Sequence, residues 1–223
     1  MNNDGMKRLT DVVAALRAPG GCPWDREQTI ETLKPYLIEE AYELLDAIDK
    51  KDMALHQEEL GDVLLQVVLQ AHIRSEEGAF DLDAVAHGIA DKLVRRHPHV
   101  FGDTKVSGTT EVLQNWEAIK RREGKHDTDT PKSPIAGVPA ALPSLLRTQR
   151  IQAKCARTGH VLQTETEATK TIAAATQRMA TGGDETAETF GELLFALCTL
   201  ARSRHIDLET ALRETANKKS LGL

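Results

Sequence analysis

Apolar residues recur every three or four positions along most of this chain, which is the spacing that places them on one face of an α-helix. Val, Ile and Thr rarely alternate with polar residues as they do in half-buried strands, whereas Leu, Ala, Glu, Lys and Arg dominate the long segments. The pattern therefore predicts an all-α protein. The expected helices span 6–16, 29–49, 53–76, 82–96, 110–123, 145–157, 165–179, 185–203 and 208–219.

Glycine, proline and short polar runs separate these segments. Residues 19–23 read Pro-Gly-Gly-Cys-Pro, which predicts a rigid loop, and residues 50–52 read Lys-Lys-Asp, which predicts a tight turn between two helices. Gly78 marks the end of one helix and Pro98 the end of the next. Residues 124–143 contain four prolines and no apolar period, so we expect a linker there.

The second half of the chain resembles the first. Residues 59–66, Glu-Leu-Gly-Asp-Val-Leu-Leu-Gln, correspond to residues 189–196, Thr-Phe-Gly-Glu-Leu-Leu-Phe-Ala. Internal similarity of this kind indicates a tandem duplication. We therefore expect an N-terminal domain at 1–123 and a C-terminal domain at 144–223 on either side of the linker.

Composition narrows the class of protein. With 223 residues, 40% of them hydrophobic and 28% charged, the chain can bury a substantial core. Its 34 acidic and 28 basic side chains leave a net charge of −6, which disfavours nucleic acid as a partner. No stretch approaches the roughly 20 apolar residues of a membrane span, and the three cysteines form no C-x-x-C pair. We expect a cytoplasmic protein that binds neither nucleic acid nor membrane.

Two pairs of carboxylates lie on consecutive predicted helices. Glu40 and Glu43 share one side of the first helix, and Glu59 and Asp62 share one side of the second. The four positions are symmetric about residue 51, inside the predicted turn, so two antiparallel helices bring all four side chains to one level. Apolar residues on the same faces indicate that these carboxylates point toward the partner helix.

Four such carboxylates repel one another unless they are protonated or neutralised by cations. Acidic helix faces usually pair with lysine four positions on, but Leu44 follows Glu40 and Val63 follows Glu59. A divalent metal ion is the simplest explanation, and ligation by oxygen alone suits Mg²⁺ or Mn²⁺. The one Glu-x-x-His, at 123–126, runs into the linker, which disfavours a ferritin-like di-iron site.

Basic and aromatic residues suggest where a substrate binds. Lys92, Arg95 and Arg96 lie on one helix side, and beside a magnesium site they suggest a phosphate ligand, although the helix dipole alone also favours a basic last turn. Trp24 can stack on a base or fill a core, and a core role is the commoner one. Lys120 is a further phosphate candidate, although a plain surface helix explains it more simply.

At these residues the sequence resembles the MazG family of nucleoside triphosphate pyrophosphohydrolases, which belongs to the all-α NTP pyrophosphatase superfamily. The resemblance covers nearly the whole chain. It rests on Gly-Cys-Pro-Trp-Asp at 21–25 with Gln28 and Thr29, the E-E-x-x-E and E-x-x-D patterns between Glu39 and Asp62, Asp-Lys-Leu-Val-Arg-Arg-His-Pro-His-Val-Phe at 91–101, Trp116 to Lys120, and residues 142–155.

The resemblance implies a Mg²⁺-dependent reaction. A nucleoside triphosphate would be cleaved between its α- and β-phosphates to give the monophosphate and pyrophosphate, with water activated by metal and no covalent intermediate. By this resemblance Glu40, Glu43, Glu59 and Asp62 hold the metal ion. Glu39 would orient or deprotonate the attacking water.

The resemblance also implies how the substrate is bound. Lys92 and Arg96 would clamp the triphosphate and stabilise charge on the pyrophosphate leaving group, and Arg95, Lys120 and Trp24 complete the candidate substrate-binding residues. The implied fold is a pair of tandem helical-hairpin units forming four-helix-bundle-like MazG domains. Dimerisation or a higher homo-oligomer would complete them, because one hairpin cannot bury its own face.

The second half departs from the family pattern. Thr189 and Glu192 stand where the first half has Glu59 and Asp62, and residues 173–177 lack paired glutamates. We therefore expect a degenerate C-terminal MazG-like repeat that packs but binds no catalytic metal. Two alternatives stay open: a narrower pyrophosphohydrolase acting on dUTP, dCTP or phosphoribosyl-ATP, and a non-catalytic dimerisation or regulatory module that binds nucleotide and Mg²⁺.

Overall fold

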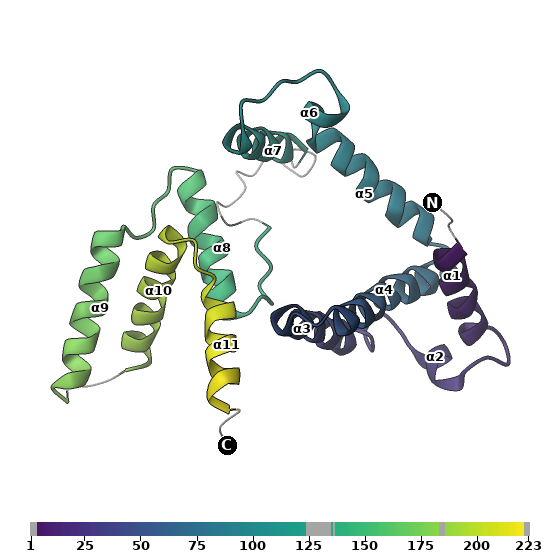
Figure 1. The fold of residues 1–223 in the computed structure, drawn as a ribbon, viewed down its shortest axis with the longest axis horizontal. Coiled ribbons are helices and arrows are strands. Elements are labelled where there is room, and N and C mark those ends of the chain that lie inside the picture. Colours follow the sequence, from purple (N-terminus) through teal and green to yellow (C-terminus); the bar gives the residue numbers. More distant parts are fainter. Residues whose placement is uncertain (1–3, 124–134, 136, 183–185, 221–223) are drawn as a thin grey trace. The chain divides into compact units, whose positions relative to one another are not determined.

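The structure is a computed structural model in which every regular element of the described residues is an α-helix (Figure 1). This confirms the all-α prediction. The described residues are 4–123, 135, 137–182 and 186–220.

The chain divides into two compact units, Met1–Asp127 and Thr128–Leu223. The division falls within residues 124–143, the stretch expected to be a linker, and residues 124–134 and 136 of that stretch lie outside the described part. Each unit contains a long helical hairpin against which an earlier helix packs. The two units therefore repeat one arrangement of helices.

The N-terminal unit is built around the hairpin of α3 and α4, with α1 packed on α4 and with α5 following α4 (Figure 1). The turn inside the hairpin lies at Lys51 and Asp52, within the predicted 50–52. Its helices are α1 (Asp4–Arg17), α2 (Pro23–Glu27), α3 (Lys34–Lys50), α4 (Met53–Glu76), α5 (Leu82–Arg96), α6 (Pro98–Phe101) and α7 (Thr109–Glu123).

Backbone geometry at the hairpin turn follows from its sequence. Lys51 ends α3 in the left-handed conformation, with φ of 57°, and its N–H donates to the carbonyl of Ile48. Asp52 then caps α4, because its side chain accepts hydrogen bonds from the N–H groups of Ala54 and Leu55. The tight turn makes α3 and α4 antiparallel neighbours, which sets the level of the side chains on both.

Two short helices and one helix start differ from the prediction. The predicted helix at 29–49 begins only at Lys34, with Pro35 in its first turn, where the missing N–H of proline has no consequence. Helices α2 and α6 lie outside the predicted helices, and both begin at a proline. They are five and four residues long, too short to show an apolar period.

The core of the N-terminal unit joins α1, the start of α3 and the second half of α4. Its buried side chains are Val13, Leu33, Val68, Leu69 and Ile73. The carboxylate half of the hairpin lies beyond this core, and large apolar side chains are exposed there. They are Leu37, Ile38, Tyr42, Leu45 and Ile48 on α3, and Leu60, Leu64 and Val67 on α4.

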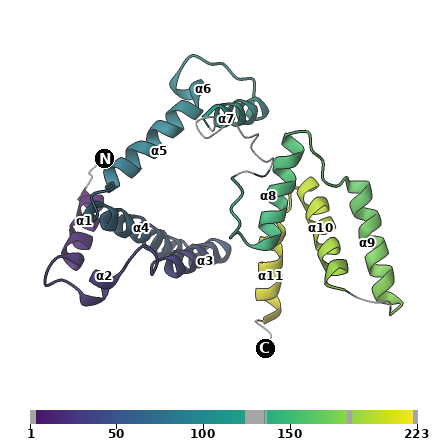
Figure 2. The ribbon, with the colours of Figure 1, turned by 180° about the vertical axis from the view of Figure 1, so that it is seen from behind.

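The C-terminal unit comprises α8 (Ser144–Arg157), α9 (Glu165–Ala180), α10 (Ala187–Ser203) and α11 (Leu208–Ser220), with the α9–α10 hairpin against α8 (Figure 2). The predicted helix at 185–203 corresponds to α10, and residue 185, its predicted start, lies outside the described part. The buried apolar side chains here are small, and two side-chain amides of α8 also connect it to other segments. Gln152 donates a hydrogen bond to the carbonyl of Phe195, and Gln149 donates one to the carbonyl of Ile206. None of the helices described in either unit is both long and apolar enough to span a membrane.

Candidate functional site

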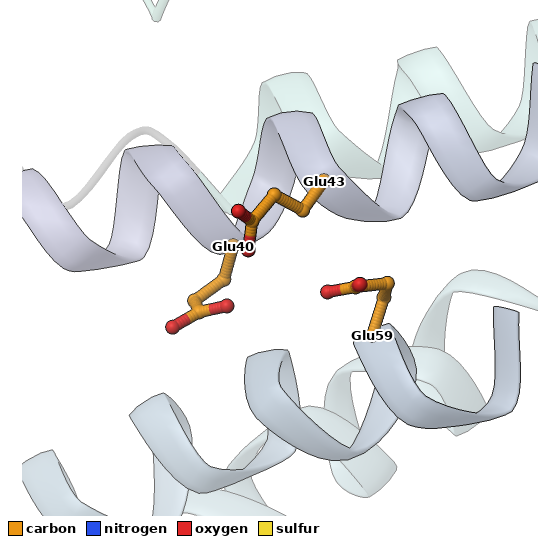
Figure 3. Close-up of side chains that lie close together, drawn as sticks. All are labelled: Glu40, Glu43 and Glu59. Carbon is orange, nitrogen blue, oxygen red and sulfur yellow. The ribbon is translucent and has the colours of Figure 1, made fainter. Parts of the chain in front are cut away.

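Three carboxylates converge between the two helices of the N-terminal hairpin. Glu40 and Glu43 extend from α3 and Glu59 extends from α4 into the space between the helices (Figure 3). One oxygen from each lies within 4.8 Å of one from each of the others. The direction of these side chains is the one that the helical spacing predicts.

Mutual repulsion and partial burial disturb the ionisation of this group. Burial is the main cause of the raised pKa of Glu40, followed by the charges of Asp62 and Glu43. Burial also raises the pKa of Glu59 most, followed by the charges of Glu43 and Asp62. The strongest charged neighbour across the hairpin is Asp62 for Glu40 and Glu43 for Glu59, which are the two pairs that symmetry about residue 51 predicts.

The carboxylates are less deeply placed than the sequence suggested. Glu40, Glu59 and Asp62 are half-buried, but Glu43 is exposed, because two helices alone leave one side of the group open. Asp62 contributes its charge but lies outside the group joined within 4.8 Å. Glu39 is exposed on α3 next to this group.

Within the described part of the chain, no ion pair neutralises these four acids. Lys50, the basic side chain whose charge lowers the pKa of Glu59, instead pairs with Asp46 at 3.0 Å. A group of unneutralised carboxylates that offers only oxygen donors suits a hard divalent cation such as Mg²⁺ or Mn²⁺. The donor set therefore fits the metal that the sequence implies.

The predicted basic residues gather around a second feature, a cleft of about 400 Å³ between α5 and α7. Lys92, Arg95 and Arg96 line it from α5, and Arg122 and Glu123 line it from α7. Glu123 makes ion pairs with both Arg95, at 3.3 Å, and Arg96, at 2.6 Å. Sequence reasoning missed Arg122 and Glu123. The partners of Glu123 lie 27 and 28 positions away, and no local spacing indicates that contact.

An aromatic ring connects two of the basic candidates. The Arg96 guanidinium lies 5.3 Å from the centroid of the Trp116 ring, and the Lys120 ammonium lies 4.9 Å from it. Both are cation–π distances. Lys120 and Arg96 therefore contact the same ring, although Lys120 does not line the cleft.

The carboxylate group and the basic cleft are separate within the N-terminal unit. Helix α5 packs on α4, α6 and α7, and both ribbon views draw it diverging from the α3–α4 hairpin (Figures 1 and 2). The described ion pairs of Arg95 and Arg96 run to Glu123 and to none of the four acids. Among the described residues of this unit, no ion pair joins the basic cleft to the carboxylate group.

Trp24 is exposed, not buried in a core. Its side chain is 51% exposed, and its ring meets that of Tyr36 edge-on with 5.9 Å between centroids. The core role expected for a lone tryptophan is therefore wrong. The side chain of Arg17 anchors α2 and the residue that follows it, because it donates hydrogen bonds to the backbone carbonyls of Asp25 and Gln28. Trp24 on α2 therefore contacts α3 at Tyr36, which lies one helical turn before Glu40.

Similarity to known proteins shows to which family this chain belongs. The MazG nucleotide pyrophosphohydrolase domain matches residues 28–101, which include all four acids and the basic side chains of α5. A nucleoside triphosphate pyrophosphohydrolase of Escherichia coli (strain K12) is 40% identical over 95% of this chain and 82% of its own length. The chain belongs to the MazG family.

Two further comparisons involve proteins of Thermotoga maritima. The nucleoside triphosphate pyrophosphohydrolase/pyrophosphatase MazG of that organism is 41% identical over 95% of this chain and 81% of its own length. A crystal structure of a MazG-related protein from the same organism is 30% identical and covers 52% of this chain and 98% of its own, with a TM-score of 0.45.

The C-terminal unit of this MazG-family chain has a different lining at the corresponding place. Thr189 and Glu192 border a cleft of about 470 Å³ between α9 and α10, together with Ala175 and Arg178. Helix α9 carries its acidic side chains only in its first turn, away from this cleft. Small, neutral and basic side chains thus line this cleft from α9, and its carboxylates, Glu188 and Glu192, come from α10 alone.

Proposed function

We propose that this chain hydrolyses nucleoside triphosphates between the α- and β-phosphates, releasing the monophosphate and pyrophosphate, with Mg²⁺ or Mn²⁺ bound in the N-terminal unit. The reaction class is supported by membership of a family whose relatives are named nucleoside triphosphate pyrophosphohydrolases. The observation that carries the proposal is the convergence of Glu40, Glu43 and Glu59 within 4.8 Å.

Four side chains would hold the metal ion: Glu40, Glu43, Glu59 and Asp62. Their negative charges attract a cation, and binding one offsets the mutual repulsion that, after burial, raises the pKa of Glu40. A divalent ion bound there would offset phosphate charge and make a bound water more acidic.

Glu39 is the proposed general base. It is exposed on α3 and lies about 100° around the helix from Glu40, so its carboxylate is not required as a ligand. An uncommitted carboxylate next to the ligands can orient a water and accept its proton. The proton would rest on Glu39 as the water oxygen attacks phosphorus.

The basic cleft is the proposed binding site for the triphosphate. Lys92, Arg95 and Arg96 offer guanidinium and ammonium donors, and Lys120 adds a cation beside Trp116. These donors would stabilise the charge that develops on pyrophosphate as it leaves. In one chain α5 leads them away from the carboxylates, so the proposal requires α5 to move or the α5 of a second copy to supply them.

Trp24 is the proposed contact for the base of the nucleotide. Its indole is half exposed and held on Tyr36, one helical turn before Glu40. Stacking on an indole discriminates weakly, because every base has a π-face. This arrangement favours a broad choice of base.

A homodimer or higher homo-oligomer is part of the proposal. The large apolar side chains exposed on α3 and α4 form a face that one hairpin cannot bury. We expect the C-terminal unit to contribute packing and no catalytic metal, since Thr189 and Glu192 replace the acid pair of the first hairpin.

The decisive experiment measures monophosphate and pyrophosphate release from a panel of NTPs and dNTPs with Mg²⁺. Glu40→Gln and the Glu40→Gln/Glu43→Gln double variant should lose turnover, because they remove ligands. Glu192→Gln in the C-terminal hairpin is the matched control and should retain it. Residual turnover in the double variant would contradict the proposed site.

The same panel decides the alternative of a non-catalytic module. Saturable nucleotide binding without pyrophosphate release by the wild-type protein would favour a regulatory role. Release from only one of dUTP, dCTP or phosphoribosyl-ATP would favour a narrow enzyme of the same superfamily.

A further inference from the structure

The last described residue of α7 joins two arginines of α5. The Oε2 atom of Glu123 accepts hydrogen bonds from Arg96 Nε at 2.8 Å and from Arg96 Nη2 at 2.6 Å. Its Oε1 atom accepts one from Arg95 Nε at 3.3 Å. One carboxylate thus contacts both guanidinium groups of the cleft.

This contact is partly shielded from solvent. The side chain of Arg96 is 17% exposed and that of Glu123 is 27% exposed, whereas Arg95 is 58% exposed. The hydrogen bond from Arg96 is the main cause of the lowered pKa of Glu123, so its carboxylate is charged at neutral pH. Arg96 also lies 5.3 Å from the centroid of the Trp116 ring. Arg96 is therefore held by two different partners.

The contact leaves part of each arginine available. A guanidinium has five N–H donors in a rigid plane. Glu123 engages Nε and Nη2 of Arg96 and only Nε of Arg95. Nη1 of Arg96 and both Nη atoms of Arg95 are not bound to it, and both residues line the same cleft as Lys92.

We propose that Glu123 is a positioning residue for the triphosphate: it fixes the planes of Arg95 and Arg96 so that their remaining donors serve one phosphate group. This inference rests on the proposed function of the cleft and deepens it. A flexible side chain that must be immobilised on binding costs about 0.5–1.5 kcal/mol, which weakens affinity about two- to tenfold. Glu123 meets that cost for the arginines before the substrate arrives.

The opposite role would be competition, in which the Glu123 carboxylate occupies donors that phosphate needs. Glu123→Asp separates the two roles, because aspartate keeps the charge but is one methylene shorter and cannot reach both arginines in the same way. Loss of positioning weakens phosphate binding, whereas withdrawal of a competitor strengthens it. Glu77→Asp is the matched control, since Glu77 pairs with Arg74 at 2.5 Å on the surface of the same unit.

The test is calorimetric titration of the full-length protein with inorganic triphosphate in EDTA, so that no metal bridges the ligand to the carboxylate group. We expect Glu123→Asp to bind triphosphate about two- to tenfold more weakly than wild type and Glu77→Asp to bind it unchanged. Arg96→Gln should bind more weakly than either. Circular dichroism at the titration temperature ensures that affinities are compared between folded proteins.

Equal or tighter binding by Glu123→Asp would overturn the inference, and so would a wild-type protein that does not bind triphosphate in EDTA. The result is independent of turnover. If the wild type releases no pyrophosphate from any nucleotide while Glu123→Asp still weakens triphosphate binding, the proposed function fails and the positioning role of Glu123 stands.

Discussion

Removing one charge from the carboxylate group should stabilise the metal-free protein. Glu40 lies within 4.8 Å of both Glu43 and Glu59, and no described ion pair offsets the three charges. Glutamine has nearly the same shape as glutamate but carries no charge. Glu40→Gln therefore removes the close repulsions with Glu43 and Glu59, the repulsion with Asp62 and the burial of one charge, while changing packing little.

The size of this effect follows from the distance. Two unit charges 4.8 Å apart repel by about 0.9 kcal/mol at the dielectric constant of water, and two such pairs by about 1.7 kcal/mol. Salt at about 0.15 M, with a Debye length of about 8 Å, reduces the sum to about 1 kcal/mol. For a chain of this length, about 1 kcal/mol raises Tm by about 2–4 °C.

The pH dependence has a definite sign. Because the pKa of Glu40 is raised above 4.5 in the folded protein, the folded state binds this proton more tightly than the unfolded state. The contribution of Glu40 to the free energy of unfolding of the wild type should therefore rise as pH falls from 7 toward about 4.5. Glu40→Gln should show a smaller rise, because the group that takes up the proton is missing.

Mg²⁺ should reverse the order of stability. An ion present at ten times its Kd stabilises the folded state by about 1.4 kcal/mol, and only a protein with the ligand set gains it. The assay is thermal unfolding at pH 7 in EDTA and again with Mg²⁺. We expect the ion to raise the Tm of the wild type but not that of Glu40→Gln.

Glu39→Gln is the matched control for this experiment. It removes one charge from the next position of α3, outside the group that converges within 4.8 Å. Its Tm should stay near that of the wild type in EDTA and should still rise with Mg²⁺. A lower Tm for Glu40→Gln in EDTA, or an equal response of all three proteins to Mg²⁺, would refute the reasoning.

Two further predictions concern the loop below Trp24 and a buried thiol. A Cβ added at Gly21 would lie 2.3 Å from the carbonyl oxygen of Leu16. Gly21→Ala should therefore destabilise the N-terminal unit by about 1–3 kcal/mol, as measured by urea unfolding. An unchanged unfolding midpoint would contradict this prediction. Burial raises the pKa of the Cys198 thiol to about 11, which leaves about 0.1% thiolate at pH 8. Iodoacetamide should therefore modify Cys198 in the native protein more slowly than the half-buried Cys22, as judged by peptide mass spectrometry; equal rates before and after denaturation would show that the burial has no effect.

Much of the fold follows from local pattern. The limits of α4 and α5 agree with the expected 53–76 and 82–96, because each helix has a clear apolar period and an aspartate cap. The start of α3 was harder to predict from the sequence, since residues 29–33 continue the apolar period but precede the helix as a turn ahead of Pro35. The apolar period alone does not distinguish an isolated turn that precedes a helix from the first turn of that helix.

Part of the candidate site likewise follows from local sequence, and part of it depends on tertiary contacts. The direction and level of Glu40, Glu43 and Glu59 follow from spacing on two helices and a three-residue turn, both of which are local properties. The depth of these side chains does not, because exposure depends on what covers the open side of the hairpin. The exposure of Trp24 likewise does not follow from local sequence, because the ring that it contacts, Tyr36, belongs to another helix.

The sequence by itself determined the helices, the hairpin and the convergence of its carboxylates, since each depends on residues a few positions apart along a regular backbone. Only the tertiary structure decided that Glu123 joins Arg95 to Arg96, and that α5 diverges from the hairpin which precedes it. Those arrangements depend on contacts between segments distant in the chain. Such contacts are selected by packing and charge in three dimensions, for which no period or spacing in the sequence provides a rule.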